Sequence, residues 1–203
     1  MTFSINHQDI LHHRLHVQAG SVGMIFIAGD SITSQSINRN TPHTNTHRSI
    51  QSESILHGIM NREQLTCVDI EWMTQAEVCN HALRFDTELR TRRILMAIEH
   101  SLRIPELRSL PKGLLTIGQH ADAIFVAARR LPGIIKAVAV LDTNQNKPVV
   151  IQEGINLPFL QIHVREPKSG NTSTSTWEEA FHTLARWFHR ELARCIAPTR
   201  IHA

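Results

Sequence analysis

Short runs of apolar residues, each of strand length, recur along this chain. Five of them, at 22–28, 65–70, 113–117, 135–141 and 159–164, are continuous rather than alternating. Continuous runs indicate strands that are covered on both faces, as in a parallel sheet. Nearer the N-terminus, Leu11, His13, Leu15 and Val17 alternate with polar residues, which predicts a half-buried strand.

Between these runs, apolar residues recur at spacings of three and four, the period of an amphipathic helix. The pattern predicts helices within 50–60, 85–102, 121–130 and 177–192. Ser175 and Glu178 provide a capping box at the start of the last one. The alternation of strands and helices predicts an α/β fold, with a mainly parallel central sheet and helices on both of its faces.

The length of 203 residues predicts a single domain, 1–203. Within it, residues 1–18 are expected to form an N-terminal edge strand segment, and residues 30–48 form a long polar loop without periodicity. No apolar run approaches the roughly 20 residues needed to span a bilayer, and the polar start is unlike a secretory signal. We therefore expect no membrane partner and a cytoplasmic protein.

Composition narrows the function further. The 21 Lys and Arg residues exceed the 18 Asp and Glu residues by only three, which does not predict a nucleic-acid partner. Cys67, Cys79 and Cys195 are too few and too scattered for a disulfide framework or a zinc knuckle. The 14 histidines include His12, His13 and His16, and also His43 and His47. Solvated or buried structural roles explain these groups more simply than metal binding, so no metal and no cofactor is expected.

Residues 110–143 contain a short strand, a five-residue turn that starts at Gly118, a small-residue helix and another strand. This order resembles the nucleophile elbow of the α/β-hydrolases. More narrowly, it resembles the small dienelactone-hydrolase-like proteins, including the domain found fused to phosphoribosyltransferases. Segments 23–28, 84–95, 157–167 and 185–188 extend the similarity to roughly residues 22–192. The resemblance implies a minimal hydrolase fold without a lid, and a catalytic triad of nucleophile, acid and His base.

The elbow departs from the pattern that the resemblance implies. Such enzymes read G-x-S-x-G, with Ser or Cys at the apex of the turn. Here the five positions are Gly118, Gln119, His120, Ala121 and Asp122, so a histidine occupies the nucleophile position. Histidine acts as a nucleophile in phosphoryl transfer, but it is a poor substitute for Ser or Cys in ester hydrolysis.

The remaining catalytic positions depart as well. Glu166 occupies the acid position, but residues 167–176, where the base should follow, contain no histidine. Ten residues are too few for the helix and strand that precede the base in the resembled proteins, so the last strand region is predicted to be shortened. Asp30 and Ser31 stand where the resembled proteins carry their oxyanion loop, and an aspartate there would repel a developing oxyanion.

The sequence thus predicts a catalytically degenerate protein, a binding or interaction module with no assigned catalytic residue. Asp30, Ser31, His120 and Asp142 are the candidates for lining a pocket for a small-molecule ligand. The alternatives are a divergent ester or lactone hydrolase with relocated catalytic residues, and a regulatory partner of a neighbouring enzyme. Without a further strand, the strand from Phe159 to Val164 would form the sheet edge, which predicts a homodimer or a protein partner there.

Overall fold

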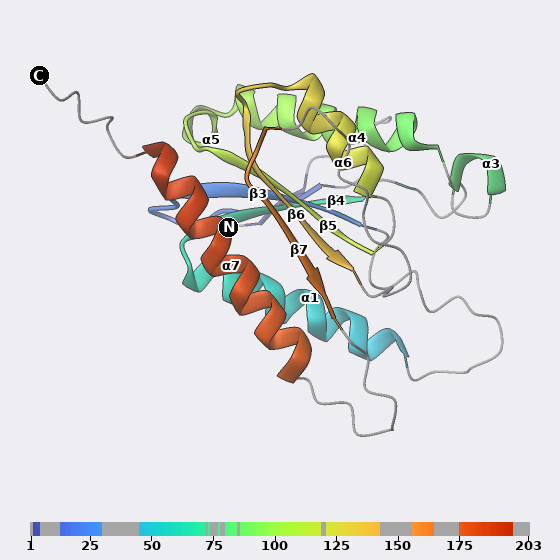
Figure 1. Ribbon diagram of the computed structural model, residues 1–203, viewed down its shortest axis with the longest axis horizontal. Helices are drawn as coiled ribbons and strands as arrows, with labels where there is room; N and C mark the ends of the chain where they lie inside the picture. Colours follow the sequence, from blue (N-terminus) through green and yellow to red (C-terminus); the bar gives the residue numbers. More distant parts are fainter. Residues whose placement is uncertain are drawn as a thin grey trace, which may run out of the picture.

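One seven-stranded sheet, with the strand order β1-β2-β4-β3-β5-β6-β7, organises the molecule (Figure 1). The computed structural model describes residues 2–4, 13–29, 45–71, 73, 77, 80–84, 86–118, 121–142, 156–164 and 175–196. The strands are β1 (Thr2–Ser4), β2 (His13–His16), β3 (Gly23–Gly29), β4 (Leu65–Glu71), β5 (Lys112–Ile117), β6 (Ile135–Asp142) and β7 (Phe159–His163). The helices are α1 (Asn45–Arg62), α3 (His81–Arg84), α4 (Thr87–Arg103), α5 (Pro105–Arg108), α6 (Ala121–Arg130) and α7 (Ser175–Ile196).

The five continuous apolar runs form the parallel part of the sheet, in the order β4-β3-β5-β6-β7. Phe26 in the central strand β3 lies opposite Val68 of β4 on one side and Leu114 of β5 on the other. At the outer edge of β4, β2 pairs antiparallel with β4, and β1 pairs antiparallel with β2. The predicted α/β class with a mainly parallel sheet is confirmed.

Helices cover both faces of the sheet, which explains why the central strands are apolar throughout (Figure 1). On one face, α4, α5 and α6 pack over a core that includes Ile98, Leu107 and Phe125. On the other face, α1 and α7 pack over a core that includes Met60 and Phe188. No helix within the described ranges is both long enough and apolar enough to cross a membrane.

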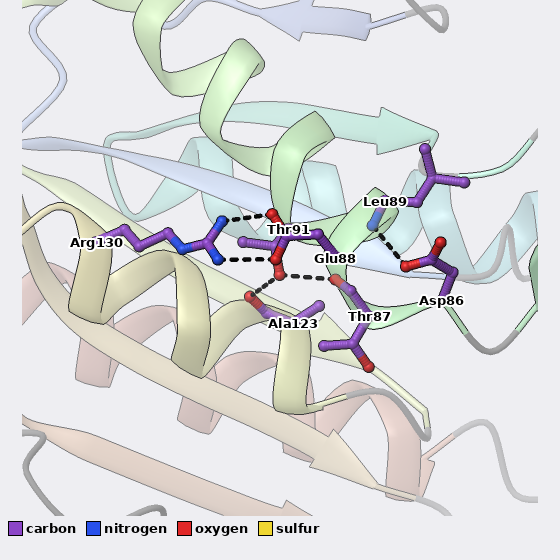
Figure 2. Close-up of polar contacts among 7 residues, drawn as sticks. All are labelled: Asp86, Thr87, Glu88, Leu89, Thr91, Ala123 and Arg130. Atoms are coloured by element: carbon purple, nitrogen blue, oxygen red, sulfur yellow. Dashed lines mark hydrogen bonds and ion pairs between the residues drawn. The ribbon is translucent and has the colours of Figure 1, made fainter.

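Two helix starts show how local chemistry sets the boundaries. The side chain of Asp86 accepts a hydrogen bond from the Leu89 N–H at 2.9 Å, so α4 begins at Thr87, two residues after the predicted start (Figure 2). Helix α1 begins at Asn45, so residues 45–48, which we predicted to belong to the long polar loop, are helical. Residues 30–44 lie outside the described residues.

Candidate functional site at the carboxyl edge of the sheet

The parallel strands β3 to β7 all end at one edge of the sheet, and open α/β sheets bind ligands there. The sequence-predicted site residues follow these strand ends in the chain. Asp142 is the last residue of β6, and the turn that starts at Gly118 directly follows β5. Asp30, Ser31, Gln119, His120 and Glu166 lie outside the described residues.

The turn between β5 and α6 is short and begins with a backbone conformation that favours glycine. Gly118 is buried and has a φ of +93°, in the left-handed region that favours glycine. Its N–H donates a hydrogen bond of 2.9 Å to the carbonyl of Leu141, which ties the turn to the end of β6. Helix α6 then begins at Ala121, so only residues 119 and 120 separate it from Gly118. The predicted strand–turn–helix order is present, and His120 directly precedes the helix in the chain.

Helix α4 contacts α6 near both of its ends (Figure 2). Near the start of α6, the buried hydroxyl of Thr91 lies 3.3 Å from the carbonyl oxygen of Ala123 and 2.8 Å from that of Thr87. In the last turn, Nη1 and Nη2 of Arg130 donate to the carboxylate of Glu88, at 2.7 and 2.8 Å. This hydrogen-bonded pair lowers the pKa of Glu88 below its ordinary value. The helix that follows the turn is therefore held by contacts outside the turn itself.

Asp142 has a histidine neighbour that the sequence did not point out. His163, the last residue of β7, is the register partner of Asp142, and its Nδ1 lies 4.0 Å from Asp142 Oδ2. The Asp142 side chain is 6% exposed and that of His163 is 44% exposed, so the pair joins a buried acid to a solvent-accessible imidazole. The strand periodicity places both on the sheet face that α6 covers, because Val140 and Phe159 pack there. Hydrolase triads also place a carboxylate beside an imidazole, at the shorter distance of a direct hydrogen bond.

The sequence signal available for His163 was its place near the end of the apolar run 159–164. The chain order of the resembled enzymes predicts the base after the acid position at Glu166, whereas His163 precedes that position. Register partners on neighbouring strands face the same side of a sheet, so the pairing of β6 with β7 brings the two residues together without any motif.

The other acid near a strand end belongs to a different group of side chains. Asp69 of β4 contacts His57 of α1 and His16 of β2. In the sheet order, β3 separates β4 from β5, so this group lies away from the β5–α6 turn. Next to it, Cys67 is fully buried, and burial raises the pKa of its thiol, with a smaller contribution from the Asp69 carboxylate. The interpretation of Cys67 as a buried apolar residue is confirmed.

The β7 edge of the sheet is the place where the resembled enzymes carry a further strand followed by the histidine base. Among the residues that the structure describes, no strand lies beyond β7. Ten residues, 165–174, join Val164 to the start of α7 at Ser175, and their sequence contains no histidine. The prediction of a shortened last strand region agrees with this arrangement.

Comparisons with known proteins identify the fold. The chain is similar to the crystal structure of a dienelactone hydrolase from Anabaena variabilis, with a TM-score of 0.69 and 15% identity over 94% of this chain and 97% of that one. It is also similar to an esterase domain from Rhodothermus marinus, with a TM-score of 0.58 and 11% identity over 95% of this chain and 98% of that one. A sugar hydrolase from Lactococcus lactis gives a TM-score of 0.56 at 10% identity, over 97% and 98% of the two chains. No model of a protein family matches the sequence. No curated protein matches it either.

These likenesses show that the chain has an α/β-hydrolase fold of the dienelactone-hydrolase type. The resemblance that we inferred from the elbow region and its flanking segments is confirmed at the level of the fold. With identities of 10 to 15%, the similarity concerns architecture and carries no activity with it.

Proposed function

We propose that this protein is a catalytically degenerate member of the α/β-hydrolase fold, which binds a ligand or a partner rather than hydrolysing an ester. One observation carries the proposal. The residue that directly precedes α6, at the end of the turn from β5, is His120, and the five elbow positions contain neither Ser nor Cys. Acyl transfer through a covalent intermediate needs an activated hydroxyl or thiol at this place.

Two further features support the proposal. Residues 165–174 contain no histidine to serve as the base after the acid position at Glu166. Asp30 follows β3 directly, where a hydrolase of this type needs hydrogen-bond donors for an oxyanion. The nucleophile, the base and the oxyanion loop thus all differ from the pattern of the resembled hydrolases. Joint loss of this kind is expected once selection for hydrolysis has ended.

The binding site that we propose is the carboxyl edge around the β5–α6 turn. Three neighbouring strands, β3, β5 and β6, end there, and the candidate residues lie at these ends or within three residues after them in the chain: Asp30, Ser31, His120 and Asp142. Their side chains offer hydroxyl, imidazole and carboxylate groups, so the proposed ligand is a small polar molecule with hydrogen-bond donors.

The proposed protein partner is a second copy of the chain, paired along β7. The Val164 N–H donates to the carbonyl of Asp142, and the carbonyl of Pro158 accepts from the Val138 N–H. The backbone N–H and C=O groups of even-numbered residues along this strand therefore point toward β6. The backbone groups of Phe159, Gln161 and His163 therefore point away from β6, toward the sheet edge. Two copies related by a twofold axis would continue the sheet from one protomer into the next. Light scattering on concentrated protein should show a dimer, and a strict monomer would exclude this partner.

A second function, ester or lactone hydrolysis by relocated groups, is favoured by the pair of Asp142 and His163. In that case, His163 would act as a general base on a water molecule, and Asp142 would orient the imidazole. Such a reaction needs no nucleophile at position 120 and is independent of His120.

Turnover of p-nitrophenyl esters and lactones separates the two functions. We expect no turnover above the buffer rate in the wild-type protein, and no change in His120→Ala. Turnover that disappears in His120→Ala would overturn the main proposal. Turnover that persists in His120→Ala but disappears in both His163→Gln and Asp142→Asn would establish the second function instead.

A further inference from the structure

Three side chains from three separate elements meet on the α1 side of the sheet. The Nε2 atom of His57 lies 2.9 Å from Asp69 Oδ1, and the Nε2 atom of His16 lies 3.5 Å from Asp69 Oδ2. The two imidazole rings are 4.3 Å apart between centroids, at an interplanar angle of 33°. The three potential ligand atoms all lie within 4.8 Å of one another. Within the described part of the chain, this is the one group of three His, Cys, Asp or Glu side chains gathered so closely.

The fold itself produces this convergence. Strand β2 runs antiparallel to β4, with His16 opposite Cys67, so the next residue on the same face of β4 is Asp69. Helix α1 covers that face, because Leu56, Ile59 and Met60 pack into the core beneath it together with Cys67. His57 adjoins Leu56 in α1 and reaches the Asp69 carboxylate from above. A strand at the sheet edge, an inner strand and a covering helix thus each contribute one side chain.

We propose that His16, His57 and Asp69 form a binding site for a divalent transition-metal ion, and specifically for zinc. Two imidazole nitrogens and one carboxylate oxygen are the donor set of many three-ligand zinc sites, in which water takes the fourth position. Bonds of about 2.0–2.1 Å in a tetrahedron separate the ligand atoms by about 3.3 Å. Each imidazole lies against its own oxygen of the Asp69 carboxylate, His57 at 2.9 Å from Oδ1 and His16 at 3.5 Å from Oδ2.

The site needs little rearrangement to accept the ion. No two of the three ligand atoms are more than 4.8 Å apart. Bringing the most distant pair to about 3.3 Å therefore requires a movement of about 1.5 Å or less. The side chains of His16, His57 and Asp69 are 29%, 14% and 27% exposed, which allows an ion to enter and a ring to turn. The carboxylate supplies the negative charge that favours a cation over water at this position.

A metal at this place would tie the edge strand β2 and the helix α1 to the inner strand β4. Because β3 lies between β4 and β5, the site is separate from the proposed ligand site at the β5–α6 turn. The inference therefore stands independently of the proposed loss of hydrolysis. A sequence pattern did not reveal it, because the ligands lie at positions 16, 57 and 69 on different elements.

Zinc titration against a coloured competing chelator tests the site, using the full chain without an affinity tag and stripped of metal beforehand. His57→Gln and Asp69→Asn each remove one ligand with little change in size, and His182→Gln in α7 is the matched control outside the group. We expect one tight zinc ion per wild-type chain, an affinity at least about tenfold lower in both ligand variants, and unchanged binding in the control. Zinc binding that is absent in the wild type, or equal in His57→Gln and wild type, would overturn the proposal.

Cobalt spectroscopy on the wild-type protein provides a second readout that does not depend on the folding of a variant. Cobalt(II) in the site should give visible absorption bands of a four- or five-coordinate nitrogen and oxygen complex. A thiolate-to-cobalt charge-transfer band would place the metal on a cysteine instead and would contradict the ligand set. Circular dichroism of each variant shows whether it is folded before its affinity is compared.

Discussion

Two glycine-to-alanine substitutions should have opposite effects, because one glycine lies under a packed helix and the other has open space around it. Gly113 lies in β5 beneath α7, and a Cβ atom added there would lie 2.7 Å from Phe188 Cε1 and 3.0 Å from Ile25 Cδ1. Favourable carbon–carbon contacts lie at about 3.5–4.0 Å. Phe188 and Ile25 are both fully buried, so neither side chain can move into solvent to relieve the overlap.

The expected magnitude follows from two opposing terms. Overpacking a close-packed core costs about 1–3 kcal/mol, whereas replacing glycine stabilises the protein by about 0.4–1 kcal/mol through the unfolded state. Gly113→Ala should therefore lower the free energy of unfolding by about 1–2 kcal/mol. A Cβ atom on Gly58, in helix α1, would meet no atom within 4 Å. Gly58→Ala should raise the free energy of unfolding by about 0.5–1 kcal/mol, because alanine has the higher helix propensity.

Urea unfolding followed by circular dichroism measures both variants against the wild type. A third variant, Phe188→Leu, removes most of the ring that the new methyl group would contact. In that background, Gly113→Ala should cost less than it does alone, by about 0.5 kcal/mol or more. If Gly113→Ala is as stable as Gly58→Ala, or equally destabilising with and without the Phe188 ring, the packing of α7 on β5 described above is wrong.

Three further predictions concern the core and the sheet edge. Burial raises the pKa of the Cys67 thiol above its ordinary value of 9.0, so the folded state keeps a proton that the unfolded state releases above pH 9.0. We compare the free energy of unfolding of the wild type with that of Cys67→Ala. The difference should be constant below pH 8 and should fall by about 1.4 kcal/mol per pH unit above pH 9. A difference that stays constant up to pH 10.5 would contradict the buried thiol. The buried Lys112 ammonium donates hydrogen bonds to the carbonyls of residues 107, 108 and 110, at 3.2, 3.3 and 2.9 Å. Lys112→Met should therefore lower the free energy of unfolding by about 1–3 kcal/mol in urea, whereas Lys136→Met should have little effect. Gln161→Pro removes an N–H that points away from β6, so it should convert the proposed dimer to a monomer in light scattering without lowering the melting temperature by more than a few degrees; a dimer that survives this change would exclude pairing along β7.

The sequence was informative wherever one element carries the signal. The continuous apolar runs predicted β3 to β7, because strands covered on both faces need apolar residues throughout. The alanine-rich stretch 121–130 predicted the full extent of α6, and the residues Leu131, Pro132 and Gly133 mark its C-terminal end. The start of α1 at Asn45 was missed, because the first turn of a helix that begins with Asn, Thr and His carries no apolar periodicity.

Contacts between elements were not predictable in the same way. His163 beside Asp142 depends on the register of β7 against β6, and that register appears only once the strands are paired. The group of His16, His57 and Asp69 depends on the placement of α1 over β4. Both groups of side chains come together only when the chain folds. The elbow, in contrast, is a local strand–turn–helix unit and was visible in the sequence alone.

Covalent labelling tests most directly the central claim that the elbow carries no nucleophile. The full chain is incubated with an excess of a fluorophosphonate, which phosphonylates activated serine hydroxyls, and then measured by intact mass spectrometry and peptide mapping. We predict an unchanged intact mass and an unmodified peptide around residues 118–122, in the wild type as in His120→Ala. A stoichiometric adduct on His120 or Ser31, absent after heat denaturation, would show that an activated nucleophile is present and would contradict the proposed loss of hydrolase function.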